Sequence, residues 1–105
     1  LFVTLSDGSI KNGYTVKLLN KTREPRRFTL DMAGVRNASL AVVGESAGGE
    51  RVSLTAEPDS VATYKLYVTA PDSALQGTRT AMTLTLTDQE GRSVSHETFF
   101  RGPGG

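Results

Sequence analysis

Short runs of alternating apolar and polar residues extend along the whole chain and predict a protein built of β-strands. The cleanest run covers 82–87, where Met82, Leu84 and Leu86 alternate with three threonines. Period-two alternation puts successive side chains on opposite faces of a strand, so the apolar set is expected to point into a core. The same pattern predicts strands at 2–5, 14–20, 27–32, 40–43, 52–55, 61–69, 82–87 and 94–100. At most one helical turn is expected, at 72–76.

Glycine dipeptides mark the expected turns between these strands. Asp7-Gly8 and Asn12-Gly13 are typical turn pairs, because glycine tolerates positive φ and the preceding side chain bonds nearby backbone. The stretch 88–91 predicts a hairpin turn, and 44–50 predicts a flexible loop.

The phase of the last strand is ambiguous from the sequence. Val94, His96, Thr98 and Phe100 share one face at period two, whereas Phe99 lies alone on the other. Two adjacent phenylalanines on opposite faces make a β-bulge plausible here.

Seven to eight strands at roughly ten-residue spacing favour an all-β fold, an immunoglobulin-like antiparallel β-sandwich. The sandwich is expected to cover 1–101, with 102–105 as a flexible tail. The chain lacks the Cys-Trp-Cys core of antibody domains, since it contains neither cysteine nor tryptophan. Tyr64 resembles the strand-F tyrosine of a tyrosine corner, whose hydroxyl bonds upstream backbone.

Composition excludes several classes of function. Twelve basic and eleven acidic residues leave a net charge of +1, too small an excess to predict nucleic-acid binding. Without cysteine the chain has no disulfide and no thiolate metal site. It also lacks an apolar run long enough to span a bilayer. Because it begins at Leu1 inside an apparent strand, we expect a piece of a longer protein with any anchor upstream.

His96 is the only histidine, and the simplest interpretation is a strand residue facing solvent or bonded at a sheet edge. The functional alternative is a copper ligand acting with Met32 or Met82, since imidazole and thioether ligands suit copper. Both methionines fall on predicted core faces, which favours packing. The turn at 88–90 carries two carboxylates but lacks the ligand set of a calcium loop.

The densest basic cluster is formed by Arg23, Arg26 and Arg27. It is either a solvated strand exit or a contact to an acidic partner or lipid headgroups. The loop 44–50, which includes Glu45, is the second candidate contact. We therefore take Arg23, Arg26, Arg27 and Glu45 as candidate partner-contact residues.

The stretch LSDGSIKNGYTVKLLNKT at 5–22 resembles the opening of the C-terminal domain of FixG/CcoG-type proteins. YKLYVTAP at 64–71, the run 82–88 and TFFRGP at 98–103 extend the resemblance along the chain. The family resemblance implies an Ig-like domain on the periplasmic face of the bacterial inner membrane. The parent would be a membrane-anchored protein with [4Fe–4S] clusters that serves cbb-type cytochrome c oxidase assembly and copper reduction.

The resemblance implies an accessory role for this domain. Because the cluster cysteines are absent, we expect a non-catalytic domain, not an enzyme, with no cofactor of its own. Protein partners, such as oxidase subunits or copper-delivery proteins, are expected, and nucleic acid is not. The alternatives are a periplasmic copper-binding domain and a carbohydrate-binding or adhesin-type sandwich. Sugar sites usually present aromatic platforms, and only Tyr67 is an outward aromatic candidate, which argues against the last.

Overall fold

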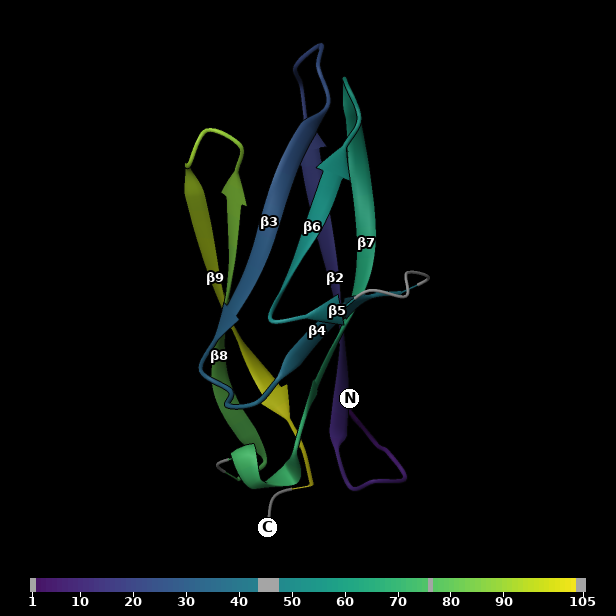
Figure 1. The fold of residues 1–105 in the computed structure, drawn as a ribbon, viewed down its shortest axis with the longest axis vertical. Coiled ribbons are helices and arrows are strands. Elements are labelled where there is room, and N and C mark those ends of the chain that lie inside the picture. The colour runs from purple at the N-terminus through teal and green to yellow at the C-terminus, as the bar shows by residue number, and fades with distance from the viewer. Residues whose placement is uncertain (1, 44–47, 76, 104–105) are drawn as a thin grey trace.

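The computed structural model describes residues 2–43, 48–75 and 77–103, and these form an elongated two-layer β-sandwich of 48 × 24 × 19 Å (Figure 1). Its elements in chain order are β1 (Phe2–Thr4), β2 (Ile10–Asn20), β3 (Arg26–Ala33), β4 (Ser39–Val42), β5 (Gly48–Gly49), β6 (Arg51–Ala56), β7 (Ser60–Ala70), the 3-10 turn η1 (Asp72–Ala74), β8 (Arg79–Asp88) and β9 (Ser93–Arg101).

The strands divide into two antiparallel sheets. One has the order β1-β2-β7-β4-β5, and the other has the order β6-β3-β8-β9. All pairings are antiparallel, and the long β2–β7 pair forms the centre of the first sheet. The structure therefore confirms the predicted all-β immunoglobulin-like sandwich and adds the short strand Gly48–Gly49, where a loop was expected.

The core lies between the sheets and is filled by the side chains whose alternation predicted the strands. Leu66 and Val68 of β7 and Met82 of β8 are almost fully buried. The other residues that are 1% exposed or less include Ile10, Leu30, Leu40, Leu54, Ala56, Ala70 and Phe100. Burial of this continuous apolar layer is the main force holding the two sheets together.

Two local predictions are wrong. Asn12-Gly13 is not a turn, because both residues lie inside β2 and Asn12 is only 3% exposed. The last strand has no bulge, because β8 and β9 pair without a skipped residue from Arg79–Arg101 to Thr87–Ser93. Register with β8 fixes the phase, so Phe100 is buried and Phe99 points outward at 42% exposure. The turn at Asp7-Gly8 is confirmed, with Gly8 at φ +91°.

The chain end beyond β9 is partly packed. Gly102 is buried, and its amide donates a hydrogen bond to the carbonyl oxygen of Thr78 at 3.1 Å. Leu75 lies so close that a Cβ on Gly102 would fall 2.3 Å from its Cδ1. The packed region thus includes at least one residue of the segment expected to be a flexible tail.

Candidate functional site

The two sheets are joined at one end by side chains of β2 that bond the free edge of β9. The Asn12 amide donates from Nδ2 to the carbonyl oxygen of Arg101 and accepts at Oδ1 from the Arg101 amide, both at 2.8 Å. The Tyr14 hydroxyl donates to the carbonyl oxygen of Phe99 at 2.8 Å. The side-chain amide of Asn12 therefore bonds both backbone groups of Arg101, as the backbone of a neighbouring strand would. This role explains why an Asn-Gly pair, which is typical of turns, occurs inside β2.

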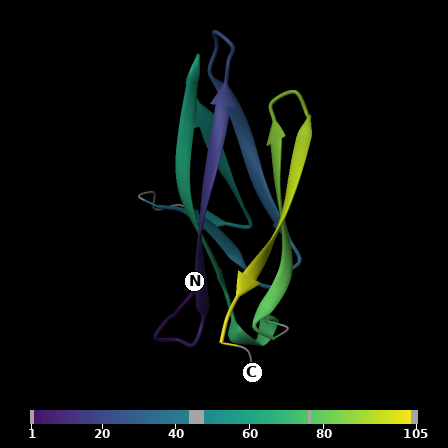
Figure 2. The ribbon, with the colours of Figure 1, turned by 180° about the vertical axis from the view of Figure 1, so that it is seen from behind.

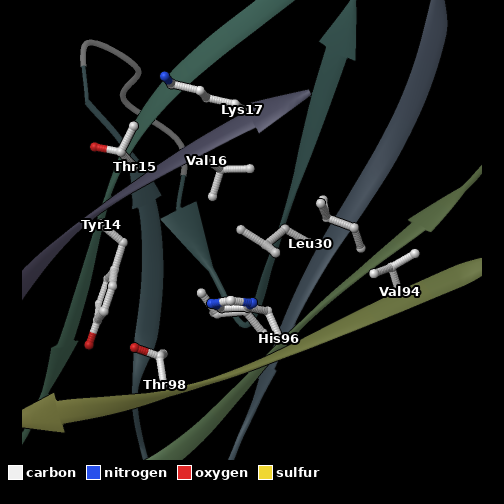
Figure 3. Close-up of a pocket in the computed structure, with 10 residues that line it drawn as sticks. Tyr14, Thr15, Val16, Lys17, Leu30, Val94, His96 and Thr98 are labelled. Atoms are coloured by element: carbon white, nitrogen blue, oxygen red, sulfur yellow. The ribbon is translucent and has the colours of Figure 1, made fainter. Parts of the chain in front are cut away.

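Beyond these bonds β2 and β9 diverge, and the β8–β9 hairpin stands apart from the neighbouring turns (Figures 1 and 2). An apolar cavity of about 320 Å³ opens between them (Figure 3). We call it the β2–β9 groove, lined by Tyr14, Thr15, Val16, Lys17, Leu30, Leu84, Leu86, Val94, His96 and Thr98.

The side of the groove formed by β9 has an open backbone edge. The Phe99 carbonyl and both backbone groups of Arg101 point away from β8, because they bond side chains of β2. Backbone polar groups alternate in direction along an antiparallel strand. Ser95 and Glu97 share this odd-numbered phase, so their amides and carbonyls also face away from β8, beside the groove.

The inward-facing positions of β9 next to the groove have no opposing strand to cover them. Val94 has the phase of the buried Phe100, yet it is 72% exposed. An aliphatic side chain at an inward position that remains in water marks a gap in the sandwich.

His96 lies within the groove and is exposed (Figure 3). Cross-strand pairing sets it opposite Leu84, two pairs along from Met82 opposite Thr98. Met82 is 2% exposed, and neither Met82 nor Met32 lines the groove with His96. Among the described residues, no three His, Cys, Asp or Glu side chains are grouped to hold a metal ion. A copper site at His96 stays a prediction without a structural feature in its favour.

Burial raises the pKa of Tyr14 to about 12, and the positive charge of Arg101 opposes this shift. The phenol is therefore neutral across the physiological range and remains a hydrogen-bond donor to Phe99. The link between the sheets at this point does not depend on pH near neutrality.

The three arginines of the predicted basic cluster, Arg23, Arg26 and Arg27, have different surroundings in the fold. Arg26 donates to Asp88 at 3.0 Å and to Glu90 at 3.2 Å, both in the β8–β9 turn region. Arg92 completes this network with a 3.2 Å contact to each of the same carboxylates. The two carboxylates of the turn are therefore paired with guanidinium groups, and Arg26 ties β3 to the hairpin.

The remaining candidate contact residues have different positions. Arg27 is exposed, and its backbone amide donates to Oε1 of Gln89 at 2.9 Å. Arg23 is exposed in the β2–β3 turn. Glu45 lies outside the described residues. The structure places Arg26 and Arg27 against the hairpin turn, so the role of these residues in partner contact stays a prediction.

Aromatic rings on the outer faces are each covered by a cation. The Lys11 ammonium lies 4.2 Å from the ring centroid of Tyr67, and the Arg79 guanidinium lies 4.8 Å from that of Phe99. The expectation that Tyr67 is the only outward aromatic is wrong, because Phe99 is equally exposed once register sets its phase. Cation–π contacts occupy a face of each ring, which does not favour the sugar-stacking alternative.

Sequence reasoning missed the groove and the open edge of β9. The available signal was the inward series Val94, His96 and Thr98, which is far less apolar than the equivalent series of β8. A half-polar inward face indicates a strand that is not fully covered.

This combination of fold and groove defines a small Ig-like module with an open sheet edge along β9. The family described as "IG-like fold at C-terminal of FixG, putative oxidoreductase" matches residues 1–103. The nitrogen fixation protein FixG of Rhizobium meliloti is 46% identical over 71 residues, 67% of this chain and 14% of that protein. Protein RdxB of Cereibacter sphaeroides is 34% identical over 107 residues, 99% of this chain and 22% of that protein.

The chain belongs to the family of FixG C-terminal Ig-like domains. A solved FixG-related protein from Vibrio parahaemolyticus shares the fold, with a TM-score of 0.72 and 23% identity over 92% of this chain and 83% of that one. The chain spans about a fifth or less of the length of the curated relatives described above. No helix in the described residues has the length and apolar character needed to cross a bilayer.

Proposed function

We propose that this chain is the non-catalytic accessory domain of a FixG-type redox protein and that it binds an extended segment of a partner protein along β9. The parent would be a membrane-anchored iron–sulfur protein that serves cbb-type oxidase assembly and copper reduction, with this domain on the periplasmic face. The observation that carries the binding role is the unpaired backbone edge of Ser95 and Glu97 beside an apolar groove.

The redox part of this proposal belongs to the rest of the parent protein. The family description names an oxidoreductase, and the relatives extend far beyond the matched region. This chain has no cysteine, so its residues do not fit an iron–sulfur cluster, which is held by thiolates. We assign no redox step to any residue here.

A partner strand added to β9 would bond the open backbone edge and cover the exposed inward face of β9. Its backbone would bond the outward amides and carbonyls of Ser95 and Glu97, as in recognition by β-strand addition. Its alternate side chains would enter the groove over Leu30, Leu84 and Leu86. The inward face of β9 would then be covered, and the exposed Val94 would leave water.

The proposal specifies the chemistry of the partner segment. The groove floor is aliphatic, and its walls carry the hydroxyl groups of Tyr14 and Thr98. The segment should be extended, with aliphatic residues at alternate positions and small or polar residues between them. Oxidase subunits and copper-delivery proteins that carry such a segment are the candidate partners.

The test is affinity capture from solubilised inner-membrane proteins of the source organism, using the wild-type chain and two variants at one position. Ser95→Pro removes the outward amide, and proline is tolerated on the open side of an edge strand. Ser95→Ala keeps that amide and loses the same side-chain contact, the 2.9 Å bond to Thr85 Oγ1. We expect capture by the wild-type chain and Ser95→Ala but not by Ser95→Pro.

Equal capture by all three folded proteins would contradict binding along β9. The experiment is also run with and without copper, because His96 lies in the same groove. Capture that requires copper and is lost in His96→Ala would support the copper-binding alternative instead.

A further inference from the structure

The described strands of the five-stranded sheet present lysines and exposed apolar side chains on their outer face, but no carboxylate. Lys11, Lys17 and Lys65 lie on this face, because their strand neighbours Asn12, Leu18 and Leu66 are buried. The described strands β1, β2, β4, β5 and β7 contain no aspartate or glutamate. We call this surface the lysine face.

Five of the eight exposed large apolar residues in the described chain also lie on the lysine face: Val3, Leu19, Val43, Val61 and Tyr67. Leu19 and Val61 are directly paired across β2 and β7, and each is 59% exposed. The apolar residues are spread from one end of the sheet to the other, among the lysines.

No carboxylate in the described part of the chain neutralises the positive charge on this face. Lys17 pairs with Thr63 and Lys65 pairs with Thr15, so the two lysines are diagonal neighbours, roughly 7–8 Å apart at Cα. No ion pair joins either of them to a carboxylate in the described ranges. Like charges at this spacing repel, and bound anions would relieve the repulsion.

The two sheets also differ in the type of cation. All four lysines of the chain lie in β2 and β7 or directly after β2, whereas every arginine within a strand belongs to the four-stranded sheet. Arginine is enriched at protein–protein interfaces and lysine is depleted there. Lysine is a hydrated point charge that needs no fixed partner geometry. A face of lysines and scattered aliphatic residues therefore suits a surface that carries many anionic groups better than it suits a protein–protein interface.

We propose that the lysine face docks on a bilayer surface that contains anionic phospholipids. Ammonium groups near such a surface each add to binding, and exposed aliphatic residues add by entering the headgroup region. The nearest described acidic residues in the sequence lie outside the strands of this sheet: Asp7, Glu57 and Asp59 are in turns, and Glu50 directly follows the edge strand β5. Glu45, which follows Val43, lies outside the described residues. Lys17 also lines the β2–β9 groove, but the open edge of β9 plays no part in this contact.

Vesicle flotation tests the proposal with a matched pair of triple variants. The vesicles contain phosphatidylcholine mixed with phosphatidylglycerol, or phosphatidylcholine alone, at low and high salt. One variant combines Lys11→Gln, Lys17→Gln and Lys65→Gln. The control combines Arg27→Gln, Arg51→Gln and Arg79→Gln, which removes the same charge from the opposite sheet.

We expect the wild-type chain and the arginine control to bind the anionic vesicles at low salt. The lysine variant should bind about a hundredfold more weakly. High salt should weaken wild-type binding, because it screens exposed charges. Equal loss in both variants, or no wild-type binding to anionic vesicles, would overturn the proposal.

A second readout reports which face meets the lipid. The chain contains no tryptophan, so a single introduced indole reports its own position. Val61→Trp lies on the lysine face and Phe99→Trp on the other sheet. Anionic vesicles should shift the emission of Val61→Trp to shorter wavelength and leave Phe99→Trp unchanged. A shift in Phe99→Trp alone, or lysine-dependent binding to polyglutamate but not to vesicles, would overturn docking on lipid.

Discussion

The hydroxyl of Tyr64 donates to the carbonyl oxygen of Thr55 and accepts from the Thr55 amide at 3.2 Å. Thr55 lies on β6, the edge strand of the four-stranded sheet, while Tyr64 lies on β7 in the other sheet. The Arg27 amide, opposite Thr55, bonds Gln89 instead, so the backbone groups of Thr55 face the open side. One phenol therefore satisfies both outward backbone groups of Thr55 at the β6 edge, and the predicted bond to upstream backbone is confirmed. Tyr64 nevertheless does not occupy the strand-F position, because β7 pairs with β2 in the five-stranded sheet.

Removing this hydroxyl should destabilise the domain and expose the β6 edge. Tyr64→Phe loses two hydrogen bonds, so we expect a loss of about 1–2 kcal/mol in the free energy of unfolding by urea. The freed edge should also increase aggregation. Tyr67→Phe is the control, because its hydroxyl makes no hydrogen bond in the described structure. Equal stabilities of the two variants would contradict this role.

Asn20 connects the two turns at one end of the sandwich and is 1% exposed. Its Nδ2 donates to the carbonyl oxygens of Glu24, Ala56 and Glu57 at 2.8–3.1 Å. Its Oδ1 accepts from the amide and hydroxyl of Thr22 at 3.0 and 2.7 Å. Every polar atom of the side chain is thus used.

Asn20→Asp should therefore be strongly destabilising, although the two side chains have the same shape. A carboxylate would face three carbonyl oxygens without a donor, and we expect a loss of about 3 kcal/mol in urea unfolding at neutral pH. Asn37→Asp makes the same chemical change at an exposed turn residue with φ +55°, where aspartate is tolerated. Similar losses in both variants would show that the network contributes little.

Two glycines with positive φ allow the stability cost of backbone strain to be measured apart from the cost of a steric clash. Gly34 has φ +103°, and a Cβ there would lie 2.5 Å from the carbonyl oxygen of Ala81. Gly91 has φ +88° and open space around it. Gly91→Ala should cost about 1–2 kcal/mol for strain alone. Gly34→Ala should cost roughly 1–3 kcal/mol more, because β8 must move. Thermal or urea unfolding that ranks the two equally would contradict this contact.

The network around Asp88 predicts how acid affects stability. Burial acts to raise the pKa of Asp88, but backbone amides of Arg92 and Glu90 and the charges of Arg92 and Arg26 outweigh it. The pKa therefore lies below 3.8 in the folded state. An acid whose pKa is lower in the folded state than in the unfolded state stabilises the fold at pH values above its unfolded-state pKa. This contribution to stability is lost as the pH falls through the folded-state pKa.

We therefore expect Asp88→Asn to be less stable than wild type near neutral pH, with the difference narrowing as pH falls below about 3.8. Asp72→Asn is the control, because that carboxylate forms no ion pair in the described ranges. Urea unfolding across the acid range gives both curves. A constant difference between wild type and Asp88→Asn would contradict the lowered pKa.

Much of the fold follows from local pattern, whereas the site does not. The alternation around Leu66 and Met82 predicted two central strands and the sides they bury. Asn12-Gly13 was misread because its partner, Arg101, is 89 residues away in the sequence. The groove exists because β2 and β9 diverge, a relation between sheets that no single strand encodes.

The measurement that tests the central claim most directly is amide hydrogen exchange at β9, in the labelled chain alone and with its captured partner. In the free chain we expect fast exchange at Ser95 and Glu97, whose amides face the open edge, and slower exchange at their neighbours bonded to β8. With the partner bound, Ser95 and Glu97 should become protected. Protection elsewhere, with these two amides unchanged, would contradict binding along β9.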